Sequence, residues 1–112
     1  MKKVFSTPNL YWTAHCQNKM RFYGLSQSRV KRVINYPKRL EEGIAPKTVA
    51  LMQSAGSQKR PSEIWVMIQD EKKEGSVKRK IISAWRYPGQ TKSDRPLPQE
   101  IIQEIRQAIE KS

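Results

Sequence analysis

The chain has 112 residues but only one cysteine, Cys16, and one histidine, His15. A single cysteine excludes an intramolecular disulfide, and one cysteine with one histidine cannot complete a structural zinc site. No apolar run approaches the roughly 20 residues that cross a bilayer, and the basic start Met1–Lys3 lacks the apolar stretch of a signal peptide. We therefore expect a cytoplasmic protein that needs no metal or other cofactor and has no contact with a membrane.

Acidic residues are also scarce. The chain carries 22 Lys and Arg against 10 Asp and Glu, a formal charge of +12. The imbalance is strongest from Thr13 to Arg39, where seven basic residues occur and no acidic one. Folding does not require such an excess, and its self-repulsion opposes compaction. The charge therefore predicts a polyanionic partner such as a nucleic acid, and leaves the oligomeric state open.

The length fits one domain, residues 1–112, with a single core. Apolar periodicity and turn residues predict the α+β class, with two N-terminal helices, a four-stranded antiparallel sheet and a C-terminal amphipathic helix. The expected segments are a lead-in at 1–12 that could include a short strand, a helix pair at 13–36, the sheet at 38–87, a linker at 88–97 and the last helix at 98–111.

Capping residues delimit the helix pair. Thr13 and Ser26 are N-cap residues, Gly24 suits a left-handed C-terminal position, and Pro37 stops the second helix. The first helix carries two stripes at helical spacing, one of Cys16, Met20 and Tyr23 and the other of His15, Lys19 and Phe22. In the second helix the inward positions are Val30, Val33 and Ile34.

Four strands are expected at Lys38–Glu42, Thr48–Gln53, Glu63–Gln69 and Val77–Tyr87. The third has a continuous apolar run, which predicts a central strand covered on both faces. Strict alternation in the fourth directs Ile81, Ser83 and Trp85 to one face and Ile82, Ala84 and Arg86 to the other. In the last helix, Ile101, Ile105 and Ile109 recur every four residues and predict an apolar side that docks on the sheet or on another chain.

The candidate catalytic residues are His15, Lys19, Ser83 and Arg86. An imidazole can take a proton from a ribose 2′-hydroxyl near neutral pH, while cations and a hydroxyl donor can stabilise the phosphorane. Two other interpretations of His15 stay open: it could help position the helix start, or it could donate a hydrogen bond to phosphate. Alternation allows Ser83 to share a face with Trp85, or Lys80 with Arg86.

Eight further residues are predicted to contact nucleic acid through phosphate pairing or base stacking: Arg21, Arg29, Lys31, Arg32, Arg79, Lys80, Trp85 and Tyr87. The alternatives are that Trp85 belongs to the core and that Lys78–Lys80 forms a solvated hairpin arm. The segment around Gly24 also has features of a DNA-binding helix-turn-helix, with Ser26–Tyr36 as recognition helix. Met20 stands where that motif has a small residue, so an ordinary helix hairpin packed on a sheet is preferred.

A family resemblance adds to these observations. It rests on Ala14-His15, Lys19-Met20, Gly24-Leu25-Ser26, Val30, Val33 and Ile82-Ser83-Ala84-Trp85. Across about residues 12–88 the chain resembles small bacterial proteins similar to the BrnT and RelE toxins of the barnase–EndoU–colicin–RelE ribonuclease group. The resemblance implies His15 as the helix histidine, Ser83 as the last-strand hydroxyl and a cation from Lys19, Arg79 or Lys80. The Trp85–Gly89 exit and the isoleucine-rich last helix depart from those toxins.

The leading hypothesis is therefore a small, metal-independent endoribonuclease of toxin type that binds RNA. In toxin systems, surplus apolar surface often meets an antitoxin, so an acidic antitoxin-like protein is a second expected partner. The alternatives are a non-catalytic RNA-binding or ribosome-associated module and a helix-turn-helix DNA-binding regulator.

Overall fold

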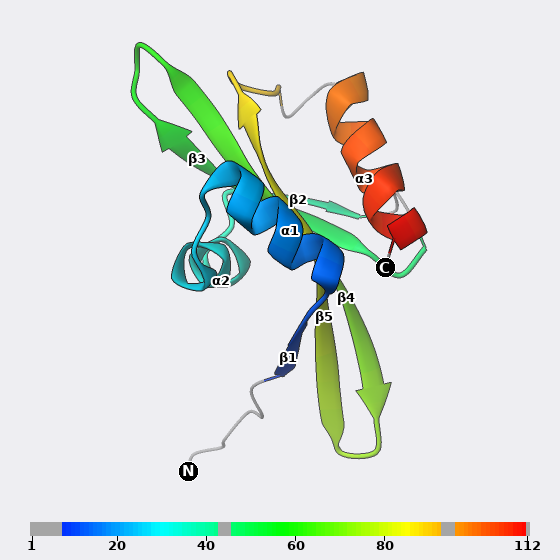
Figure 1. Ribbon diagram of the computed structural model, residues 1–112. Coiled ribbons are helices and arrows are strands. Elements are labelled where there is room, and N and C mark those ends of the chain that lie inside the picture. The colour runs from blue at the N-terminus through cyan, green and yellow to red at the C-terminus, as the bar shows by residue number, and fades with distance from the viewer. Residues whose placement is uncertain (1–7, 43–45, 93–95, 112) are drawn as a thin grey trace.

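One five-stranded sheet with helices on both faces forms the molecule (Figure 1). The computed structural model describes residues 8–42, 46–92 and 96–111. Its elements in chain order are β1 (Asn9–Trp12), α1 (Ala14–Tyr23), α2 (Gln27–Asn35), β2 (Arg39–Glu42), β3 (Val49–Gly56), β4 (Pro61–Lys73), β5 (Ser76–Pro88) and α3 (Gln99–Lys111). Residues 1–7 of the expected lead-in and 93–95 of the expected linker lie outside the described residues. Within the described parts, no helix has the length and apolar character needed to cross a membrane.

The strand order is β1-β5-β4-β3-β2. Strands β2 to β5 form the expected antiparallel meander. The prediction of a purely antiparallel, four-stranded sheet is wrong, because β1 adds a fifth strand parallel to β5, pairing Asn9 with Lys78 and Trp12 with Ile81. The α+β class is confirmed. The possible short strand in the 1–12 lead-in is present as β1. Its place in the sheet could not be predicted, because parallel pairing joins segments far apart in the chain and leaves no local turn signal.

Local capping chemistry explains where the helix pair begins and turns. The Thr13 hydroxyl accepts a hydrogen bond from Cys16 N at 3.0 Å, and the Ser26 hydroxyl accepts one from Arg29 N at 3.1 Å. Gly24 has φ of 68°, a left-handed conformation that costs glycine little. Thr13 also reaches the carbonyl oxygens of Ile81 and Ile82 at 3.2 and 3.0 Å. One threonine thus starts α1 and fixes it to β5.

The sheet separates two apolar cores. One contains the buried side of the helix pair, including Cys16, Val30 and Val33, and the other contains the buried side of α3. All six residues from Glu63 to Ile68 are buried, which confirms the central, doubly covered strand. In α3 the buried stripe is Ile101, Ile105 and Ala108, whereas Ile109 is 40% exposed. The expected four-residue repeat therefore drifts off the helix face, because an α-helix turns every 3.6 residues.

A bulge in β5 overturns the expected alternation. Met67 pairs with Ser83 but Ile68 pairs with Ile81, which leaves Ile82 as an extra residue. Ile81 consequently lies in the helix-pair core with Ala84, while Ile82 lies in the α3 core with Trp85. An inserted residue shifts every later side chain by one position, and an isoleucine-rich run does not reveal where that occurs.

Candidate nucleic-acid interface

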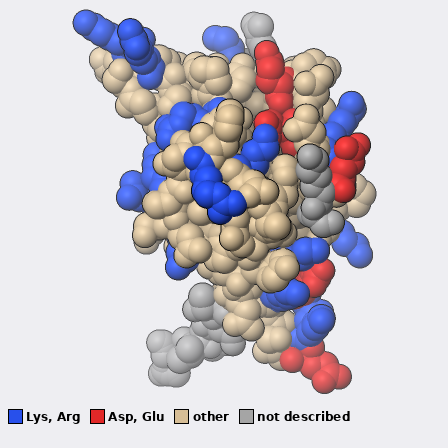
Figure 2. Space-filling model, viewed as in Figure 1, with Lys and Arg blue, Asp and Glu red and all other residues tan. Residues whose placement is uncertain are grey.

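Charge is unevenly distributed over the molecular surface. Figure 2 shows Lys and Arg over α1, α2 and the tip of the β3–β4 hairpin with no acidic residue among them, whereas Asp and Glu on this face lie over α3 and, mixed with Lys and Arg, along the β4–β5 hairpin. The acidic residues of α3 include Glu100, Glu104 and Glu110. The basic excess is therefore concentrated on the helix-pair side, where a polyanion would meet the most favourable field.

On that side, two arginines lie close enough to a third, Arg29, for their charges to lower its pKa. Arg29 and Arg32 belong to α2 and Arg86 to β5, and we call this set the arginine cluster. Desolvation lowers the pKa of Arg29, and the positive charges of Arg32 and Arg86 lower it further. In the part of the chain that the structure describes, none of the three forms an ion pair with a carboxylate. The cluster is thus a concentration of positive charge whose natural counterion is an external anion.

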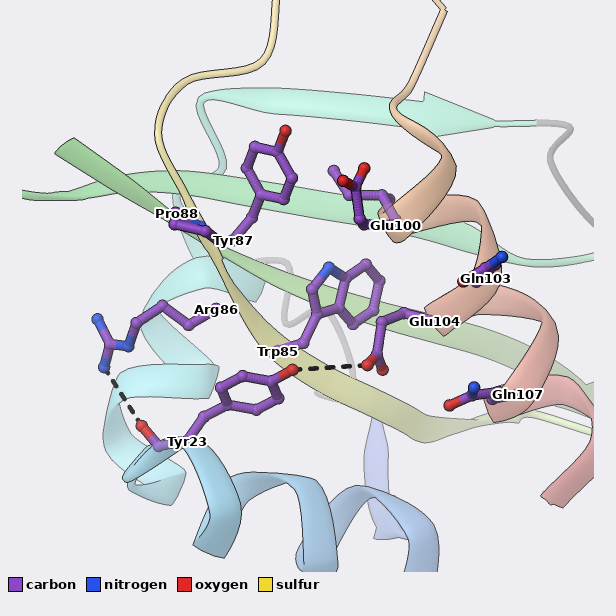
Figure 3. Close-up of a pocket in the computed structure, with 10 residues that line it drawn as sticks. Tyr23, Trp85, Arg86, Tyr87, Pro88, Glu100, Gln103, Glu104 and Gln107 are labelled. Atoms are coloured by element: carbon purple, nitrogen blue, oxygen red, sulfur yellow. Dashed lines mark hydrogen bonds between the residues drawn. The ribbon is translucent and has the colours of Figure 1, made fainter.

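A glutamine on β3 holds the cluster in place. Gln53 Oε1 accepts a hydrogen bond from Arg29 Nη1 at 2.6 Å, while its Nε2 donates to the carbonyl oxygens of Arg32 at 3.2 Å and Tyr36 at 2.9 Å. The Arg32 carbonyl also accepts a hydrogen bond from Tyr36 N at 2.9 Å, so Gln53 reinforces the last turn of α2 and binds the carbonyl of its C-cap residue. Arg86 Nη2 donates to the Tyr23 carbonyl at 3.5 Å (Figure 3). Each contact fixes a side chain or a helix end without neutralising a guanidinium.

An exposed aromatic residue stands at the end of α2, the helix that carries Arg29 and Arg32. Tyr36 ends α2, and its side chain is 74% exposed although its carbonyl is bound by Gln53. An exposed aromatic ring is costly to keep in water and suited to stacking on an unpaired base. Cations for phosphate and an aromatic face for a base therefore lie close together, joined through one glutamine.

The groove between α1 and α3 is a second basic region, with a different charge balance. His15, Asn18, Lys19 and Phe22 of α1 line it together with Gln107 of α3, around a volume of about 510 Å³. The expected stripe of His15, Lys19 and Phe22 therefore faces one groove. Lys19 Nζ, however, lies 2.9 Å from Glu104 Oε2, and the Tyr23 hydroxyl donates to the same oxygen at 3.5 Å (Figure 3). Here the lysine charge already has an internal counterion.

The hydroxyl predicted to complete a catalytic group is not in this groove. Ser83 is fully buried on the α3 side of the sheet, it does not line the groove, and its Oγ has no hydrogen-bond partner among the described residues. Ser83 and Trp85 do lie on the same face of the sheet, as one of the two predicted alternatives had it. That face, however, is buried in the core. The structure therefore brings His15 and Lys19 together and leaves Ser83 apart from them.

Trp85 is not available to stack on a base. It is 2% exposed and lies parallel to Trp65, with ring centroids 6.1 Å apart. The prediction of a nucleic-acid contact at Trp85 is wrong and the core alternative is correct, because α3 covers this face of the sheet. Tyr87 is only half-buried, and it lines a cavity of about 320 Å³ beside Arg86 and α3 (Figure 3).

The remaining residues predicted to contact nucleic acid differ in whether an acidic side chain already pairs with them. Lys31 is exposed on α2, and Arg21 is exposed on α1, where it donates to the Asn18 side chain. Arg79 forms a bidentate pair with Asp70 at 2.7 and 2.8 Å, and Lys80 lies 3.9 Å from Glu71. The Lys78–Lys80 run thus belongs to a hairpin arm with its own acidic partners, in agreement with the solvated-arm alternative.

Three residues important to this arrangement escaped the sequence analysis: Gln53, Tyr36 and Glu104. Each contributes through a contact with a residue in another element, and spacing along the sequence does not reveal such a contact. In the described ranges, no three His, Cys, Asp or Glu side chains gather as the ligands of a metal ion would. Burial raises the pKa of the Cys16 thiol to about 12, so this cysteine is unsuited to metal binding or nucleophilic attack.

Comparisons with known proteins found no protein similar to this chain. No family model matches the chain, and no curated protein or solved structure is significantly similar to it.

Proposed function

We propose that this protein binds RNA through the arginine cluster and the exposed Tyr36 ring. The observation that carries the proposal is the convergence of Arg29, Arg32 and Arg86, from α2 and β5, without a carboxylate partner in the described chain. Guanidinium groups bind phosphate oxygens bidentately, and stacking on an aromatic ring tolerates any base. The formal charge of +12 strengthens the field that guides the polyanion to this face.

Single-stranded RNA is the preferred ligand over duplex DNA. An exposed aromatic ring such as that of Tyr36 stacks on an unpaired base, which a single strand offers and an intact duplex does not. The test is fluorescence anisotropy with labelled single-stranded RNA, structured RNA and duplex DNA over a range of salt. We expect single-stranded RNA to bind most tightly, with an affinity that falls steeply as salt rises. Equal or tighter binding of duplex DNA would favour the helix-turn-helix regulator instead.

Cleavage of the bound RNA is a second candidate. It is favoured by the α1–α3 groove, which places His15 and Lys19 on one surface. An imidazole can accept the proton of the attacking 2′-hydroxyl, a cation can stabilise the phosphorane, and the 5′-oxygen that leaves as the P–O5′ bond breaks takes a proton from water. The buried Ser83 hydroxyl is assigned no step, and Arg86 is assigned to phosphate binding rather than to turnover.

The cleavage assay is run with EDTA present, and the products are examined for 2′,3′-cyclic phosphate ends. Turnover that His15→Ala abolishes while RNA affinity is retained would support the ribonuclease of toxin type. Intact RNA after prolonged incubation would leave the non-catalytic binding module. An acidic antitoxin-like protein would compete with RNA for the arginine cluster, and added RNA should displace such a partner.

A further inference from the structure

The outer edge of β2 has a charge pattern that complements itself. β2 is a terminal strand of the five-stranded sheet, so one of its edges has no neighbouring strand among the described elements. Its sequence with the preceding residue is Lys38-Arg39-Leu40-Glu41-Glu42, positive at one end and negative at the other. Edge strands commonly avoid self-association by carrying charged side chains, especially Lys. This segment instead has two basic residues before Leu40 and two acidic residues after it.

We propose that two copies of this chain associate through antiparallel pairing of β2 with β2, centred on Leu40. In this register Leu40 lies opposite Leu40 of the second copy, and Arg39 lies opposite Glu41 in both directions. Opposite charges across a strand pair stabilise it, whereas a parallel arrangement would place Arg39 against Arg39. Antiparallel pairing of identical strands about one centre is also what a two-fold symmetric dimer requires.

Leu40 is itself an argument for a covered edge. It is 52% exposed, and it pairs with Leu51, which is buried in the helix-pair core. Leu40 therefore lies on the sheet face that α2 covers over the neighbouring strands, but none of the described helices covers Leu40 itself. A second copy would bury this side chain against its own symmetry mate.

The net charge of the protein singles out the same strand. Two molecules of formal charge +12 repel over most of their surfaces. Glu41 and Glu42 are the only acidic residues among the first 47, so β2 is the place on the N-terminal half where a second basic copy finds negative charge. Arg39 pairs with Glu41 of its own strand at 2.6 Å and donates to the Thr91 hydroxyl at 2.7 Å, so the proposed pairing would join two such ion pairs into one network. The proposal is independent of RNA binding.

The decisive experiment uses disulfide geometry. Antiparallel neighbours have Cα atoms about 5 Å apart, within the limit of about 7 Å for a disulfide. Leu40→Cys should therefore cross-link to its own symmetry mate in a glutathione redox buffer. In the same register, Glu42 lies roughly 13 Å along the strand from Glu42 of the other copy, beyond that limit. Glu42→Cys is thus a matched, exposed control, and the native Cys16 is buried and does not compete.

We expect the Leu40→Cys protein to form a covalent dimer at least about tenfold faster than the Glu42→Cys protein. Equal rates, or faster cross-linking at position 42, would overturn the proposed register. Both rates are followed on non-reducing gels with the folded state checked by circular dichroism.

Sedimentation of the unmodified chain tests association itself. It should show a monomer–dimer equilibrium in the micromolar range, because the interface is short. Leu40→Asp places like charges directly opposite each other and should weaken the dimer at least about tenfold. Phe22→Asp makes the same change in net charge at an exposed site on α1 and should leave association unchanged. A wild-type chain that stays monomeric throughout, or a Leu40→Asp dimer of native affinity, would overturn the proposal.

Discussion

Arg29 and Arg32 of the arginine cluster and Lys19 of the α1–α3 groove come from the same basic run, yet only Lys19 is paired with a carboxylate among the described residues. Arg29 and Arg32 remain without a carboxylate among the described residues, and burial together with mutual repulsion lowers the pKa of Arg29. Lys19 meets Glu104 at 2.9 Å. The difference comes from α3, which brings an acidic residue from the far end of the chain to only one of the two places. Whether a cation is available to bind an external anion therefore depends on whether the fold places a carboxylate beside it.

Removing charge from the arginine cluster should have the largest effect. Arg29→Gln with Arg32→Gln should weaken binding of single-stranded RNA about 10- to 50-fold at low salt, because two phosphate contacts are lost. The log–log salt slope should become shallower by roughly 1.4, at about 0.7 per phosphate for a single strand. Anisotropy titrations at several salt concentrations measure both quantities.

The control removes the same charge elsewhere. Lys72 on β4 and Arg106 on α3 are exposed cations outside the cluster and the groove, and their double change to Gln lowers the net charge equally. It should reduce affinity only a few-fold through the general field. If both double variants lose the same affinity, binding is a property of net charge and the cluster has no special role.

The two exposed aromatics provide the next comparison. Tyr36 lies beside the arginine cluster and Phe22 beside the groove, and both are more than 70% exposed. Tyr36→Ala should weaken RNA binding about fivefold or more, since stacking contributes roughly 1–3 kcal/mol per base. Phe22→Ala should change affinity less than twofold. The reverse ranking would transfer the RNA path from the cluster to the groove.

Local chemistry made part of this arrangement predictable. Thr13, Gly24 and Ser26 fix the helix pair through contacts within a few residues, so sequence spacing is sufficient to find them. The same holds for β4, whose apolar run requires cover on both faces. Residues of this kind act through neighbours in the chain, and a single sequence records those neighbours directly.

The site depended on pairings that spacing does not reveal. Lys19 and Arg29 are both cations on helices, and only the packing of α3 makes Glu104 the partner of the first. Arg86 was expected in a catalytic group, yet its side chain lies on the face opposite to Trp85, close to Arg29 of α2 and to the Tyr23 carbonyl. Ser83 was assigned a role by its hydroxyl alone, and burial removed it from the groove.

Removing Glu104, the counterion of Lys19, should make the α1–α3 groove resemble the arginine cluster in having a cation without a carboxylate partner. Glu104→Gln frees the charge of Lys19 and should strengthen RNA binding about two- to threefold through the added positive charge. Glu104 also raises the pKa of Tyr23, after the larger effect of burial, through its charge and their hydrogen bond. Spectrophotometric titration should therefore show a lower pKa for Tyr23 in the variant. Glu110→Gln adds the same charge at an exposed position and is the matched control.

The smallest effect is expected where an ion pair is largely solvated, on the projecting β4–β5 hairpin. Hydrogen bonding to Arg79 is the main reason that the pKa of Asp70 lies below its usual value. A depressed carboxyl pKa contributes stability above the unfolded-state value near 4, and this stability is lost as pH falls through the folded-state value. Because Asp70 is more than a third exposed, solvent screening limits the contribution to a few tenths of a kcal/mol. Asp70→Asn should therefore lower the free energy of unfolding slightly at pH 7, with the difference from wild type vanishing in acid. Urea denaturation at both pH values measures it, and a loss of several kcal/mol at pH 7 would mean that the hairpin pair supports the fold as strongly as the buried contacts of the core.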